Sequence, residues 1–106
     1  MNKSGLPDTV VQKIIEIFRD YPEIDRVILY GSRAKGNWRN GSDIDLCIVA
    51  ATLNLPKLWD IENRIDDLLL PWKVDLSLWH QIDNPDLLDH IGRVGKVFYR
   101  CDSVKN

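Results

Sequence analysis

The chain has 106 residues, of which 44% are hydrophobic and 28% charged, so it fits one globular domain over residues 1–106 and is not disordered throughout. Its formal net charge of −2 excludes a general attraction to nucleic acid or anionic membranes, so we expect no strong binding to either. No apolar run reaches the roughly 20 residues that span a bilayer, and no signal peptide is visible. We therefore expect a cytoplasmic protein.

The first part of the chain predicts a helix, a strand and a basic turn. Apolar residues recur at helical spacing from about residue 7 to residue 20, with Pro7 suited to the first turn and Pro22 ending the pattern. Residues 26–30 form a short apolar run that is typical of a buried strand, and Gly31 stops it. Residues 32–41 are polar, basic and interrupted by glycine, so we expect a turn with room for one helical turn.

The middle of the chain predicts a second strand, a helix and a third strand. Residues 43–50 are apolar on both faces after the first few positions, which is typical of a strand inside a covered sheet. Asn54 is a good N-cap for a helix over residues 55–70, which Pro71 ends. Its apolar stripe is predicted to comprise Leu58, Ile61, Ile65, Leu68 and Leu69. Residues 73–79 alternate between apolar and polar, as an exposed strand does.

The last part of the chain predicts one more helix and a short strand. Asn84 and Pro85 are strong helix-starting residues, and the helix should run to about Arg93 before Gly95 closes it. Residues 97–99 are apolar enough for a short final strand. This alternation of helices and strands predicts an α/β or α+β fold, with a sheet covered by helices.

Two acids open the second predicted strand. Asp43 and Asp45 lie two residues apart, so the strand places both side chains on one face, roughly 6–7 Å apart. Such a pair is costly unless a cation neutralises it, and ligands that are all oxygen suit Mg²⁺ or Mn²⁺. If the third strand neighbours the second, Asp75 completes a three-carboxylate site of the kind that holds two metal ions. Asp75 could also accept a proton from an attacking hydroxyl.

A turn that could hold phosphate comes before these acids. Gly31 and Ser32 lie where a strand ends, so their backbone N–H groups and the Ser32 hydroxyl can face a phosphate. Arg33 and Lys35 add positive charge to the same loop, which would favour a triphosphate. The order along the chain is therefore a candidate triphosphate site followed by a candidate metal site.

These residues carry a family resemblance. Gly31-Ser32, ten further residues and then Asp43-Ile44-Asp45 resemble the GS-x10-DxD signature of the polymerase-β-like nucleotidyltransferase superfamily. Residues 29–36 and 41–46 look especially like its minimal, single-domain branch, which is often paired in prokaryotes with a helical HEPN protein. The preceding helix, Asp75 and residues 95–97 also fall where the family expects them. The resemblance implies the polymerase-β-like fold, a small mixed sheet covered by helices.

The resemblance also implies roles and a reaction. Gly31 and Ser32 would bind nucleotide phosphates, Asp43 and Asp45 would ligate two Mg²⁺ ions (or Mn²⁺), and Asp75 would complete the site. The family moves a nucleoside monophosphate from ATP or a related triphosphate to an acceptor and releases pyrophosphate. In the branch paired with HEPN proteins, the enzyme is the antitoxin of a type VII toxin–antitoxin pair and adenylylates a tyrosine of its toxin. We therefore expect a HEPN toxin partner, in a hetero-oligomer or homo-oligomer.

Other interpretations stay open at this point. The chain could be a binding module that neutralises a toxin without catalysis, or it could transfer the nucleotide to a small molecule or an RNA end, although it lacks an acceptor-binding domain. Asp43 and Asp75 could be solvent-facing strand acids, and Arg33 and Lys35 could be solvated. The residues for which we expect structural or exposed positions are Trp38, Cys47, His80 and His90.

Overall fold

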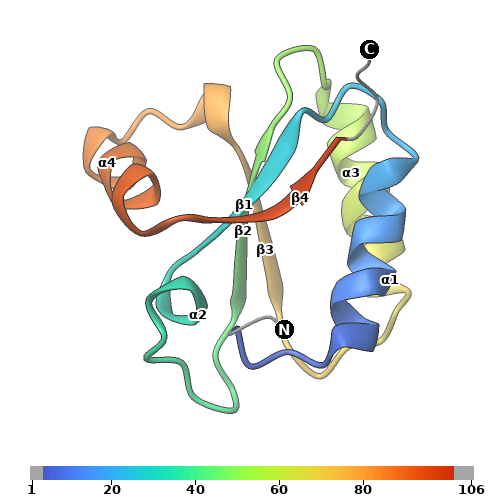
Figure 1. Ribbon diagram of the computed structural model, residues 1–106. Coiled ribbons are helices and arrows are strands. Elements are labelled where there is room, and N and C mark those ends of the chain that lie inside the picture. Colours follow the sequence, from blue (N-terminus) through green and yellow to red (C-terminus); the bar gives the residue numbers. More distant parts are fainter. Residues whose placement is uncertain (1–3, 102–106) are drawn as a thin grey trace.

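The computed structural model describes residues 4–101, which form one four-stranded sheet with helices packed on it (Figure 1). None of the helices within these residues is long and apolar enough to cross a membrane. The elements in chain order are α1 (Asp8–Arg19), β1 (Arg26–Tyr30), α2 (Ser32–Lys35), β2 (Ile44–Val49), α3 (Leu55–Asp66), β3 (Val74–Leu78), the 3-10 turn η1 (Trp79–Gln81), α4 (Pro85–Val94) and β4 (Lys96–Arg100).

The sheet is mixed, with the strand order β3-β2-β1-β4. β1 lies between β2 and β4 and is antiparallel to both, whereas β2 and β3 are parallel. The parallel pair needs a crossover connection, and α3 supplies it. The predicted mixed sheet covered by helices is therefore confirmed, and β3 and β4 are its two edges.

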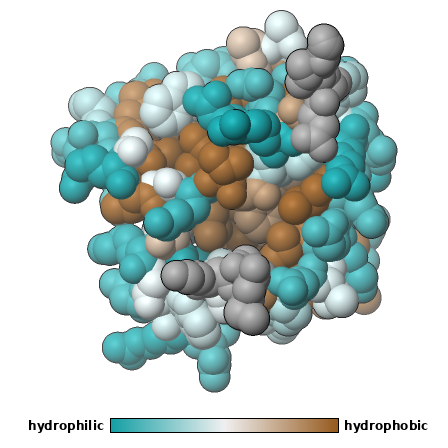
Figure 2. All heavy atoms as spheres, viewed as in Figure 1, coloured by the Kyte–Doolittle hydropathy of each residue, from teal (hydrophilic) through white to brown (hydrophobic). Residues whose placement is uncertain are grey.

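The two faces of the sheet are covered differently (Figure 1). α1 and α3 pack side by side over one face, where Ile44, Leu46 and Ile48 of β2 are fully buried. On the other face α4 covers only part of the sheet, and Ile91 meets Tyr30 and Cys47 in a small separate cluster. Figure 2 shows hydrophobic residues gathered on the surface between α4 and α1. Because Ile44, Leu46 and Ile48 belong to the larger cluster of buried residues, the main hydrophobic core lies on the face of α1 and α3.

Most predicted elements are present, and their caps explain why they start where they do. The Asn54 side chain accepts a hydrogen bond from Lys57 N at 3.0 Å, and that of Asn84 accepts one from Asp86 N at 2.9 Å. Pro7 is the N-cap of α1 and not a first-turn residue, since its carbonyl accepts the hydrogen bond from Val10 N at 3.0 Å. Cys47 is fully buried, as expected, and burial raises its thiol pKa to about 11.

The predicted helix over residues 55–70 is too long. α3 ends at Asp66, and Leu69 has a left-handed backbone (φ 55°) with 87% of its surface exposed, so it is not part of the apolar stripe. The sequence keeps a helix-like spacing of apolar residues beyond Asp66 because Leu68 and Leu70 still pack against the core after the helix has ended. Pro71 therefore follows an irregular connection and does not terminate the helix.

Candidate active site

The glycine–serine turn sits directly against one of the predicted metal ligands. Gly31 leaves β1 with a positive φ of 75° and is the N-cap of the short α2, which begins at Ser32. A Cβ atom at Gly31 would come within 2.3 Å of the Asp45 carboxylate oxygen Oδ2. Glycine is therefore required here for two reasons, its backbone conformation and the close approach of Asp45. Ser32 is half-buried beside this contact.

The predicted acids lie on neighbouring strands in matching register. Asp45 of β2 pairs with Tyr30 of β1 on one side and with Asp75 of β3 on the other. Residues paired in this way project from the same face of the sheet, about 4.8 Å apart across the strands. Asp43 precedes Asp45 by two positions, just before β2 starts. The strand order that an Asp45–Asp75 site requires is thus present.

The charges of these acids act on one another. The pKa of Asp45 is raised above its ordinary value, first because the side chain is partly buried and then because Asp75 and Asp43 are negative. Lys73 and His90 oppose the shift, which places both near Asp45. The site therefore collects more negative charge than its own surroundings neutralise.

This excess charge and the all-oxygen set of Asp43, Asp45 and Asp75 fit a divalent metal such as Mg²⁺. In the part of the chain that the structure describes, no three acidic, histidine or cysteine side chains already converge on one point. Asp43 and Asp75 are exposed, so their side chains are free to turn toward an ion beside Asp45. We therefore treat Asp45 as the centre of the candidate site.

Arg33 does not face the site as predicted. Only 3% of the residue is exposed, and its guanidinium donates to Ser4 O at 2.8 Å and to Ser42 O at 2.9 and 3.2 Å. The rings of Trp38 and Trp72 lie 5.5 and 5.6 Å from it. Each guanidinium nitrogen donates to a backbone carbonyl and the residue is buried, so we correct the predicted phosphate contact: Arg33 anchors the loop that leads to Asp43. Lys35 is exposed, and its predicted phosphate contact stays a prediction.

The structure adds residues that the sequence did not point to. His90 of α4 lies edge-on to the Tyr30 ring, 6.3 Å between ring centres, and the Tyr30 hydroxyl is 3.4 Å from Ser77 Oγ. Burial raises the Tyr30 pKa, and the Asp45 and Asp75 charges raise it further. A search for aromatic and hydroxyl residues in phase with the acids would have found Tyr30 and Ser77. Nothing in the helix α4 pattern says which face it covers, so His90 had no such signal.

A glycine–serine turn beside carboxylates on one sheet face is an arrangement typical of enzymes that transfer phosphoryl or nucleotidyl groups. Residues 12–104 match the family described as polymerase beta, nucleotidyltransferase, so the chain belongs to this family. The resemblance predicted from the sequence is thereby confirmed.

Individual relatives narrow the comparison. A candidate protein adenylyltransferase of Methanocaldococcus jannaschii is 32% identical over 77 residues, which cover 72% of this chain and 78% of that protein. A chain in a crystal structure of a toxin–antitoxin with AMP-PNP superposes with a TM-score of 0.69 at 28% identity, covering 87% of this chain and 74% of that one. A chain in the complex of tri-AMPylated Shewanella oneidensis HEPN toxin with MNT antitoxin gives 0.65 at 25% identity, covering 88% and 71%.

Proposed function

We propose that this protein transfers AMP from ATP to a hydroxyl of a partner protein, a tyrosine of a cognate HEPN toxin, and so acts as the antitoxin of the pair. Its relatives support this proposal, since they include a candidate protein adenylyltransferase and an MNT antitoxin bound to an AMPylated toxin. The observation that carries it is the position of Asp45. This carboxylate lies against Gly31 of the turn and beside Asp75 of the next strand, so one residue joins the phosphate and metal parts of the site.

The proposed roles follow from where each residue lies. The turn at Gly31 and Ser32 binds the triphosphate through backbone N–H groups and the serine hydroxyl. Asp43 and Asp45 would hold the metal, and Asp75 would complete the site. When bound, two Mg²⁺ ions supply positive charge that lowers the pKa of the acceptor hydroxyl and stabilises the departing pyrophosphate. Lys35, the last residue of α2, would meet the outer phosphates.

The reaction forms one bond and breaks one. The acceptor oxygen attacks the α-phosphorus of ATP, the bond from that phosphorus to the oxygen bridging to the β-phosphate breaks, and pyrophosphate leaves with the electron pair. The hydroxyl proton passes to the Asp75 carboxylate, which is exposed on the edge strand and can release it to water. Tyr30 and Ser77 project from the same face of the sheet as Asp45 and Asp75. Tyr30 pairs with Asp45, and Ser77 follows Asp75 by two positions on β3.

The experiment mixes the protein with labelled ATP, Mg²⁺ and the product of the adjacent gene, which the proposal expects to be a HEPN-type protein, and measures the mass of that partner. We expect gains of whole AMP units with the wild type and none with an Asp43→Asn/Asp45→Asn double variant that still binds the partner. Equal labelling by both proteins would overturn the metal site. A wild type that binds the partner and protects against it without any labelling would point to a binding module.

A further inference from the structure

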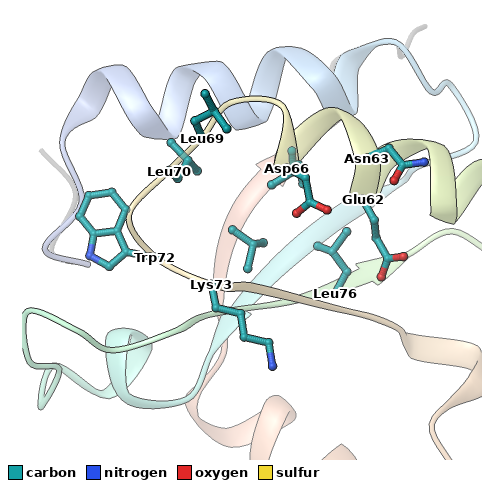
Figure 3. A pocket seen from close by; sticks show the side chains of 10 residues that line it. Glu62, Asn63, Asp66, Leu69, Leu70, Trp72, Lys73 and Leu76 are labelled. Carbon is teal, nitrogen blue, oxygen red and sulfur yellow. The ribbon is translucent and has the colours of Figure 1, made fainter.

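A groove runs along the outer edge of β3, between this strand and the end of α3 (Figure 3). It encloses about 550 Å³. Its lining combines apolar side chains, among them Trp72, Val74 and Leu76, with the charged side chains of Lys73 of the strand and Glu62 and Asp66 of α3. The groove is on the opposite side of β3 from the acids, but it shares the strand with Asp75.

The strand beside this groove has an open edge. Lys73 O accepts a hydrogen bond from Ile44 N at 2.8 Å, so the backbone groups of Lys73, Asp75 and Ser77 point toward β2. By alternation, those of Val74 and Leu76 point outward. Within residues 4–101 no strand pairs with this side of β3, which is the last strand of the sheet. An open row of backbone donors and acceptors is a template for another strand.

The connection at the end of the groove carries a second unusual feature. Leu69 lines the groove with 87% of its surface exposed, and it holds a left-handed backbone that leucine rarely adopts. Strained residues of this kind persist where the surrounding structure needs them and are frequent at binding sites. Here the left-handed turn presents a large apolar side chain to solvent beside the groove.

We propose that the groove and the open edge of β3 bind an extended segment of the acceptor protein, which adds to the sheet as a strand next to Asp75. This inference rests on the proposed function, in which the acceptor is a protein. An added strand lies about 4.8 Å from β3, and its residue opposite Asp75 projects from the same face as that carboxylate. The acceptor hydroxyl would thus lie beside Asp75, which accepts its proton in the proposed reaction, and beside the nucleotide.

The same geometry specifies the sequence of the segment. The residues on either side of the acceptor project to the other face, beside Val74 and Leu76 of β3, so apolar side chains fit there. Glu62 and Asp66 on the rim favour a basic residue at an end of the segment. These acids also repel phosphates, so an RNA strand does not fit the groove. The predicted acceptor is therefore a tyrosine between two apolar residues, in an extended stretch with arginine or lysine nearby.

A synthetic peptide tests this directly. The probe is a capped peptide with the order Arg-Leu-Tyr-Leu-Arg, and its control carries methyl groups on the backbone nitrogens of the tyrosine and both leucines. Hydrogen exchange of the intact protein is followed by NMR. We expect the probe to slow exchange at the amides of Val74 and Leu76, which lack strand partners in the free protein, and we expect the methylated control to have no such effect.

A charge-reversal variant tests whether Glu62 and Asp66 on the rim of the groove contact the bound peptide. Glu62→Lys/Asp66→Lys should weaken peptide binding by about tenfold, the effect of reversing one half-buried and one exposed charge contact. Glu16→Lys/Asp83→Lys changes the net charge equally at exposed positions outside the groove and should bind as the wild type does. Lysine at the last residue of α3 is favourable for the helix, so the fold should be kept, which circular dichroism checks.

The outcomes separate the two proposals. Protection at Val74 and Leu76 that is lost in the Glu62→Lys/Asp66→Lys variant supports the docking surface, even where the peptide receives no AMP and the proposed function fails. AMP transfer to the partner without any protection at Val74 and Leu76 would overturn the docking surface while leaving the proposed function standing. Equal binding by the two charge variants would also overturn it.

Discussion

The two faces of the central strand β2 have opposite properties. On the face of α1 and α3, Ile44, Leu46 and Ile48 are all fully buried. On the other face Asp45 lies between Gly31 and Asp75, and only a small cluster around Cys47 is packed. Stability is therefore concentrated on one face and chemistry on the other.

This division has a geometric consequence for the site. A slip of one residue in the register of β2 would turn its apolar side chains to the open face and Asp45 into the core. The packing of Ile44, Leu46 and Ile48 thus determines where Asp45 points. The acids need no strong contacts of their own to be placed, because the opposite face places them.

We expect the largest effect from adding a side chain at Gly31, where the turn contacts Asp45. Gly31→Ala puts a Cβ at the 2.3 Å approach of Asp45 Oδ2, so Asp45 must move and AMP transfer should fall on the order of 100-fold or more. Gly36→Ala is the matched control, since Gly36 also has a positive φ of 87° but nothing within 4 Å of its Cβ position. Initial rates of AMP transfer compare them. Equal losses would mean that backbone conformation, and not the Asp45 contact, is what matters.

The next effect belongs to the packed face. Ile61→Ala removes a fully buried side chain of α3 and should lower the free energy of unfolding by about 2–5 kcal/mol. Leu55→Ala, at a position that is 41% exposed on the same helix, should cost under about 1 kcal/mol. Denaturant titration measures both. A similar cost at the two positions would contradict the claim that this face carries the core.

A substitution at Arg33 tests whether this buried side chain holds in place the loop between the Gly31-Ser32 turn and Asp43. Arg33→Lys keeps the charge but cannot donate to Ser4 O and Ser42 O together, so we expect a loss of about 1–3 kcal/mol in stability and a slower rate of AMP transfer. Lys35→Ala, by contrast, should leave stability unchanged and raise the KM for ATP. If Arg33→Lys raised only the KM for ATP, the buried arginine would be a phosphate ligand after all.

The smallest expected effect is a change in how the stability of the fold depends on pH, and it comes from Asp45 on the open face of the sheet. Because the folded-state pKa of Asp45 is raised, its contribution to stability is present at acid pH, where the carboxyl is protonated, and is lost as the pH rises through that pKa. Asp45→Asn removes this loss, so without metal the variant should gain stability relative to the wild type toward neutral pH. Denaturation in a chelating buffer over a pH series measures the difference. Parallel curves would show that Asp45 carries no excess charge repulsion.

The sequence predicted the parts of this molecule that depend on local pattern. The apolar run of β1 needs only strand periodicity and was interpreted correctly. Asp45 is in β2 and Asp43 lies just before it, and their role as metal ligands stays a prediction. The end of α3 was missed because Leu68 and Leu70 stay in contact with the core outside the helix. Arg33 was misplaced since composition shows a basic loop but not which of its side chains turns inward. The pairing of Asp45 with Asp75 depends on strand order, which only the family resemblance could supply.

The crossover through α3 also sets the order in which the site can come into existence during synthesis. Gly31 and Asp45 leave the ribosome together, but Asp75 follows only after the whole of α3 and arrives on an edge strand that β2 alone holds. A growing chain therefore possesses its turn and first acids well before it can complete the carboxylate pair. Under the proposed function, catalytic competence is therefore acquired late, when β3 docks on β2 and brings Asp75 beside Asp45.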